Sequence, residues 1–142
     1  MINSNKNLKL AIIGLGYVGL PLALEFSKKR SIVGFDINKT RIEELNSGID
    51  KNLEFNKEEL LAYKDLKFTY NEEDLKSANC YIITVPTPID KLNKPNLKPL
   101  LIASEMISKI INKGDLVIYE STVYPGCVEE VCVPILEKFS KL

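Results

Sequence analysis

Gly14, Gly16 and Gly19 are the residues of this sequence whose spacing points most directly to chemistry. They follow a short apolar run typical of a strand and precede a segment with helical period. Gly14 would permit a tight turn, Gly16 would let the backbone approach a pyrophosphate, and Gly19 would let helix and strand pack without an intervening Cβ. The pyrophosphate would then lie at the helix N-terminus, where N–H groups and the helix dipole favour its charge.

A glycine pattern of this kind also arises by chance, but Asp36 follows the second expected strand about twenty residues later, which completes a dinucleotide-binding fingerprint. A carboxylate there would accept hydrogen bonds from the adenosine ribose and repel a 2′-phosphate, so NAD is favoured over NADP. Asp36 has a second interpretation, as a polar strand end or a cap of the next helix. Arg41 could accommodate a 2′-phosphate, but beside Asp36 it is interpreted as a ribose or adenine contact. A surface arginine in a helical turn is an equal alternative for Arg41.

Thr87 and Thr122 lie in loops expected at the carboxyl ends of later strands, where open α/β sheets bind ligands. Their position makes them candidates, although turn and capping chemistry explains both equally well. Glu120 is ambiguous in the same way. Cys127 stands near an expected helix start, where a lowered pKa could make it a nucleophile, yet a lone cysteine without a base is more often packing.

The elements that must position these residues alternate between short β-rich runs and longer segments of helical period. Strands are expected at 8–13, 32–35, 66–70, 81–85 and 116–119. Helical segments are expected from the glycine turn to about 29, from 38 to near 48, at 58–63, at 71–77, from 99 to about 112, and at 127–139. This order predicts an α/β fold of Rossmann type, with a doubly wound, mostly parallel sheet, helices on both faces, and one domain over 1–142.

Composition argues against several other classes of function. Basic and acidic side chains balance at 19 each, so no nucleic-acid partner is indicated. The chain has no histidine, which excludes Ser-His-Asp and Cys-His catalysis within these residues. Its three cysteines include no CxxC pair, so neither a disulfide scaffold nor a metal site is expected. Without a long apolar run or a signal-peptide start, a cytoplasmic protein with no membrane contact is expected.

Three blocks of the sequence together resemble the UDP-glucose/GDP-mannose dehydrogenase family. They are Gly14-Leu15-Gly16-Tyr17-Val18-Gly19-Leu20-Pro21, Val85-Pro86-Thr87-Pro88 and Tyr119-Glu120-Ser121-Thr122-Val123-Tyr124-Pro125-Gly126. The blocks occur in the family's order, and the resemblance covers nearly the whole chain. The residues of these blocks most resemble those of the bacterial branch that oxidises UDP-N-acetylhexosamines for surface polysaccharides. The resemblance implies an NAD-dependent, two-step oxidation of the C6 alcohol of a UDP-hexose or UDP-N-acetylhexosamine to a carboxylate, through a thioester on a cysteine.

The resemblance also implies roles for single residues. Asp36 and Arg41 would hold the adenosine ribose, Tyr17 and Val18 would line the pyrophosphate turn, and Thr87 would contact the cofactor. The full-length enzyme would be a homo-oligomer that binds its UDP-sugar mainly outside this segment.

Thr122 would lie beside the nicotinamide and help to position a water molecule or an oxyanion. The family's nucleophilic cysteine belongs downstream of the matched segment, and none of Cys80, Cys127 and Cys132 matches it. The chain is therefore expected to be an NAD-binding fragment that is inactive alone. Two alternatives remain: an NAD-dependent dehydrogenase of the β-hydroxyacid type, whose loops would differ, and a non-catalytic NAD-sensing module.

Overall fold

The computed structural model describes residues 7–140 and 142, which form one five-stranded parallel sheet with the strand order β3-β2-β1-β4-β5. The strands are β1 (Leu10–Ile13), β2 (Ile32–Phe35), β3 (Leu66–Thr69), β4 (Cys80–Ile83) and β5 (Leu116–Tyr119). The helices are α1 (Gly19–Ser27), α2 (Lys39–Asn46), α3 (Lys57–Leu61), α4 (Lys98–Ser108) and α5 (Val133–Ser140), with a 3₁₀ helix η1 (Glu72–Ser77) and a π-helical turn η2 (Val128–Cys132). The predicted Rossmann-type α/β fold is confirmed.

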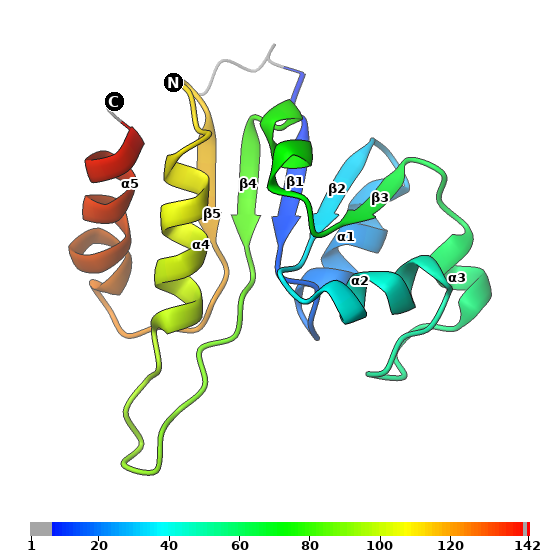
Figure 1. Cartoon of the computed structure of the whole chain (residues 1–142), viewed down its shortest axis with the longest axis horizontal. Coiled ribbons are helices and arrows are strands. Elements are labelled where there is room, and N and C mark those ends of the chain that lie inside the picture. The colour runs from blue at the N-terminus through cyan, green and yellow to red at the C-terminus, as the bar shows by residue number, and fades with distance from the viewer. Residues whose placement is uncertain (1–6, 141) are drawn as a thin grey trace.

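The two faces of the sheet carry separate apolar cores, because alternate strand residues point to opposite sides. Leu10 and Ile12 of β1 belong to one core, which is completed by apolar residues of α1, α2 and α3. Ala11 and Ile13 belong to the other, with residues of η1, α4 and η2. In Figure 1, α4 and α5 stand beside each other at the β5 end of the sheet, whereas α1, α2 and α3 gather toward the β2–β3 end. Helices therefore cover both faces, as the doubly wound fold requires.

Local capping signals predict several boundaries correctly. The Asn38 side chain accepts a hydrogen bond from the backbone N–H of Arg41, which confirms it as the N-cap of α2. Asn71 caps η1 in the same manner, with Glu73 as its donor. Gly48 follows α2 with a φ of 78°, a backbone conformation that glycine adopts without strain.

Other boundaries differ from the expectation. β1 and β4 are shorter than the predicted 8–13 and 81–85, and the loop after β4 carries Pro86 and Pro88, which cannot donate to a ladder. The helix expected at 127–139 begins instead as the π-helical η2 and becomes α5 at Val133. Pro134 has no N–H to donate, which fits a change of helical hydrogen bonding at this point. No helix in the described part of the chain is long and apolar enough to cross a membrane.

Candidate functional site

The turn between β1 and α1 has two glycines that the fold needs and one that it does not. Gly14 has a φ of 97°, and its N–H donates to the Phe35 carbonyl at 2.8 Å. A Cβ on Gly19 would lie 1.7 Å from the Gly14 carbonyl oxygen, so only glycine fits there. A Cβ on Gly16 would meet no protein atom within 4 Å. The turn and packing roles predicted for Gly14 and Gly19 are confirmed, and Gly16 faces open space that a ligand can occupy.

Thr84, directly after β4, contacts the backbone of this turn through its side chain. This role was not predicted from the sequence. The buried Thr84 hydroxyl lies 2.7 Å from the Gly14 carbonyl oxygen and 3.1 Å from that of Ile13. The sequence signal that could have indicated this role is a threonine directly after an apolar strand. At the start of α1, Val18 offers no side-chain cap, the N–H of Leu20 donates to the Gly16 carbonyl at 3.1 Å, and Pro21 has no N–H. The N–H of Gly19 is therefore the donor in the first turn that an anion could use.

Asp36 joins the glycine turn to the start of α2. Its Oδ2 accepts from the backbone N–H of Leu15 at 2.9 Å, and its Oδ1 accepts from the N–H of Asn38 at 2.9 Å. An ionised carboxylate offers about four acceptor sites, so these two bonds leave capacity for ribose hydroxyls. The two interpretations from the sequence are therefore compatible, since one carboxylate can order the turn and still face a ligand.

Arg41 reaches back from α2 to the same turn. Its Nε and Nη2 donate to the Leu15 carbonyl oxygen at 3.1 and 2.9 Å, and its Nη1 donates to Oδ1 of Asp50 at 2.8 Å. Only 11% of the Arg41 side chain is exposed. The side chain is therefore not that of a surface arginine in a helical turn, the alternative interpretation from the sequence. A contact of Arg41 with ribose or adenine stays a prediction. Leu15 is held at both ends, by Asp36 at its N–H and by Arg41 at its carbonyl.

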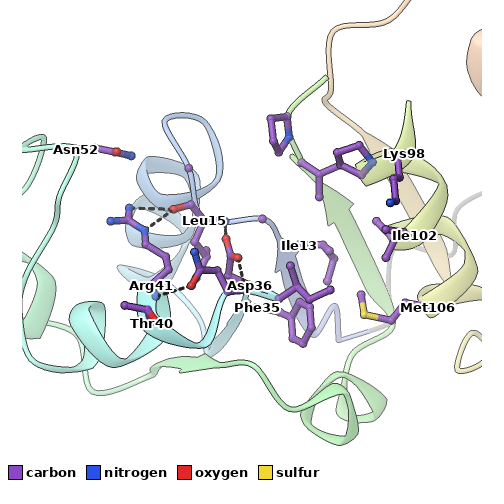
Figure 2. A pocket seen from close by; sticks show the side chains of 18 of the residues that line it. Ile13, Leu15, Phe35, Asp36, Thr40, Arg41, Asn52, Lys98, Ile102 and Met106 are labelled. Atoms are coloured by element: carbon purple, nitrogen blue, oxygen red, sulfur yellow. Dashed lines mark hydrogen bonds between the residues drawn. The ribbon is translucent and has the colours of Figure 1, made fainter. Parts of the chain in front are cut away.

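These residues border a cavity of about 600 Å³ above the carboxyl ends of the central strands. Four of the predicted site residues line it, namely Gly14, Gly16, Asp36 and Arg41. Figure 2 shows the last two on one side of the cavity and Lys98, Ile102 and Met106 on the other. These three belong to α4, for which the sequence predicted only a packing role in the fold. The lining is polar at α2 and mostly apolar at α4, where Lys98 is the charged residue, and it suits a ligand with a charged and a flat apolar part.

The loops after β4 and β5 come together beside this cavity. The Thr87 hydroxyl donates to the backbone carbonyl of Thr122 at 2.6 Å, and the Ser121 hydroxyl donates to that of Val85 at 2.6 Å. The structure therefore brings the two predicted threonines together, although neither is among the residues that line the cavity. Tyr17 and Val18 are also outside the lining and are 69% and 55% exposed. Their roles toward a cofactor stay predictions.

All three cysteines are buried as free thiols. Burial raises the pKa of the Cys80 and Cys132 thiols, which disfavours the reactive thiolate. Cys127 is fully buried in the core that contains α4, where it packs against apolar neighbours. Its surroundings favour the packing interpretation over the nucleophilic one. Among the described residues, no cluster of three or more metal-ligating side chains forms.

Comparison with known proteins places this geometry in a family. Residues 8–142 match the model of the UDP-glucose/GDP-mannose dehydrogenase family, NAD binding domain. The chain is 61% identical over 137 residues to a UDP-N-acetyl-D-glucosamine 6-dehydrogenase from Pseudomonas aeruginosa, a match that covers 96% of the chain and 32% of that relative. The chain thus spans about a third of the length of the curated relatives it matches.

Solved structures agree with the sequence match. The UDP-D-ManNAc dehydrogenase from Pyrococcus horikoshii superposes with a TM-score of 0.83 at 36% identity, over 95% of this chain and 33% of that one. A ternary complex of GDP-mannose dehydrogenase from Pseudomonas aeruginosa gives a TM-score of 0.86 at 28% identity, with the same coverage. With the family model matching nearly its whole length, the chain belongs to the UDP-glucose/GDP-mannose dehydrogenase family and is its NAD-binding domain.

Proposed function

We propose that the protein to which this chain belongs oxidises the C6 alcohol of a UDP-N-acetylhexosamine, or of a UDP-hexose, to the uronic acid for polysaccharide biosynthesis. The observation that carries the proposal is the 61% identity to a UDP-N-acetyl-D-glucosamine 6-dehydrogenase across 96% of the chain. NAD⁺ would supply the chemistry by accepting hydride from the sugar carbon. Residues 1–142 would supply the NAD site of this enzyme, and other parts would supply the nucleophile and most of the sugar contacts.

The described residues fit NAD in three respects. Gly16 opens onto space that no protein atom fills, which leaves room for a pyrophosphate next to the backbone. The start of α1 has no side-chain cap, which leaves the N–H of Gly19 for its charge. Asp36 lines the cavity with acceptor capacity to spare, which suits the ribose hydroxyls of a nucleotide. In this proposal Tyr17 and Val18 flank the pyrophosphate from their exposed places after Gly16.

The threonine pair belongs to the same proposal. Thr87 and Thr122 lie where the loops after β4 and β5 meet, at the carboxyl edge where open α/β sheets bind ligands. Thr122 would then border the nicotinamide and help to position the water or oxyanion of the reaction, while Thr87 holds its loop through the Thr122 carbonyl. Assembly into a homo-oligomer, a cytoplasmic location and the absence of nucleic-acid partners remain predictions from the sequence.

A hybrid enzyme tests the proposed activity. Residues 8–142 of this chain replace the matching segment of the UDP-N-acetyl-D-glucosamine 6-dehydrogenase from Pseudomonas aeruginosa, to which they are 61% identical. The hybrid is expected to reduce NAD⁺ when given UDP-N-acetyl-D-glucosamine, within about tenfold of the parent enzyme, because the chemistry-bearing parts are unchanged and a native NAD site is supplied. NADH absorbance with each UDP-sugar measures it.

The matched control is the same hybrid carrying Gly16→Val, which should fold and remain inactive. A hybrid that folds and binds NAD⁺ but oxidises no UDP-sugar would contradict the proposal. That outcome would favour the alternative of a domain that senses NAD without serving catalysis.

A further inference from the structure

The position of the Arg41 guanidinium bears on which cofactor the cavity can accept. An arginine close to the end of the second strand can receive the 2′-phosphate of NADP, so Asp36 alone does not settle the preference. In this structure three nitrogens of Arg41 already have partners, two on the Leu15 carbonyl and one on Asp50. The planar fork is therefore held in one orientation, against the backbone of the glycine turn.

Asp50 is itself fixed in a position that holds the Arg41 guanidinium in this orientation. Its side chain is fully buried, and besides Arg41 it accepts from the backbone N–H groups of Asn52, Glu54 and Phe55 at 3.0 to 3.2 Å. Burial by itself would raise the pKa of the Asp50 carboxyl. The hydrogen bonds from Arg41 and from the backbone outweigh it and hold the pKa below its usual range. Asp50 is thus ionised at neutral pH and fixed in place by its own loop.

The charges around the ribose end of the cavity add up to an excess of one negative charge. Arg41, which lines the cavity, and Asp50, which lies behind it, neutralise each other as an ion pair. Lys51 and Glu44, which both line the cavity, form a second pair. The carboxylate of Asp36 remains. A 2′-phosphate carries a charge of about −1.5 to −2 near neutral pH and would be repelled there. Lys98 lines the opposite side of the cavity, so no unneutralised cation lies on the Asp36 side to receive the phosphate.

We propose that Asp50 determines cofactor specificity, by holding Arg41 on the Leu15 carbonyl and neutralising it so that the 2′-phosphate of NADP finds no unneutralised cation next to Asp36. Asp50 acts through Arg41 and is a positioning residue. The inference rests on the proposed NAD contacts of Asp36 and extends them to a residue of the loop after α2. In this proposal the loop after α2, which no sequence motif marks, contributes to the selectivity of the site for NAD over NADP.

Asp50→Asn tests the proposal by removing the charge that neutralises Arg41. Calorimetric titration of the chain gives the dissociation constants for NAD⁺ and NADP⁺, and their ratio is the readout. The ratio of the NADP⁺ dissociation constant to the NAD⁺ dissociation constant is expected to fall by about tenfold or more. The reason is that the released Arg41 would form a charge-assisted hydrogen bond with the 2′-phosphate, and one such bond usually changes affinity by about this factor. A merely structural role would weaken both cofactors together and leave the ratio unchanged, which would overturn the proposal.

Two variants serve as matched controls. Asp74→Asn also removes an ion-paired aspartate, the partner of Lys67, but Asp74 does not line the cavity, so the ratio should stay at the wild-type value. Arg41→Met in the Asp50→Asn background should return the ratio to the wild-type value, because the gain depends on the released guanidinium. A gain that persists without Arg41 would contradict the mechanism.

A measurement on the unaltered chain decides the matter even if Asp50→Asn does not fold. Arg30 and Arg41 are the only arginines, so ¹⁵N NMR shows two Nε–H signals, with Arg30, which is exposed, as the internal reference. The Arg41 Nε–H should exchange slowly with water, both with and without NAD⁺. Exchange as fast as that of Arg30 would overturn the proposal. Failure of the unaltered chain to bind either cofactor would instead refute the proposed NAD site.

Discussion

Gly16→Val is expected to abolish NAD binding and leave the domain folded. A Cβ at Gly16 meets no protein atom within 4 Å, and the residue is not among the glycines with a positive φ, so the fold tolerates a side chain there. The valine would fill the space through which a pyrophosphate reaches the backbone N–H groups. Loss of two charge-assisted hydrogen bonds corresponds to about 3 kcal/mol or more of binding free energy. Circular dichroism checks the fold and calorimetry checks the affinity.

Gly19→Val is the matched control, because the same side chain is added three residues later. There the Cβ would lie 1.7 Å from the Gly14 carbonyl oxygen and 2.5 Å from the Thr84 hydroxyl oxygen. The free energy of unfolding should drop by more than about 4 kcal/mol, or the domain should fail to fold. A folded Gly16→Val variant with unchanged NAD affinity would remove the glycine turn from the binding site.

The second prediction with a large expected effect is that the chain alone does not oxidise a UDP-sugar. The 142-residue chain, given NAD⁺ and any UDP-hexose or UDP-N-acetylhexosamine, is expected to produce no NADH. The first hydride transfer, from alcohol to aldehyde, needs the UDP-sugar held against the nicotinamide, and the proposed function assigns most of the sugar contacts to other parts of the enzyme. The second transfer needs a thiolate to trap the aldehyde, and all three cysteines in the chain are buried in the apolar cores. When a group that acts as part of a catalytic unit is missing, nearly all the rate is lost, so Thr122 should not rescue it.

NADH absorbance followed over hours at high protein concentration measures that turnover, with Cys127→Ser as the control variant. Equal, background-level signals from the two proteins are the expected result. Turnover in the unaltered chain that disappears in Cys127→Ser would mean that Cys127 leaves the core to react, and that a complete catalytic centre lies within these residues.

Local signals explain why so much of the fold could be predicted. The alternation of apolar runs with helical periods, the asparagine caps at Asn38 and Asn71, and the glycines at 14 and 19 each act over a few residues, so the sequence shows them directly. The ends of the elements were predicted less accurately. The ends of β4 and the π-helical start of the last helix depend on which backbone N–H groups find partners in the sheet or in the helix.

The candidate site was predictable only where a motif names the residue. Thr84 contacts Gly14 across 70 positions of sequence, and Asp50 matters because Arg41 turns toward it and toward Leu15. Neither contact leaves a pattern in a single sequence. The α4 side of the cavity, with Ile102 and Met106, has the same explanation, because helical period shows that a helix packs but not which of its residues border a cavity.

Calorimetric titration of the unaltered chain with NAD⁺, NADH and NADP⁺ tests the central claim most directly. One site per chain should bind NAD⁺ and NADH, and NADP⁺ should bind at least about tenfold more weakly, because Asp36 would face the ribose while Asp50 neutralises Arg41. Equal or tighter binding of NADP⁺ would show that Arg41 governs the pocket. No binding of any of the three would contradict the assignment of the cavity to a dinucleotide.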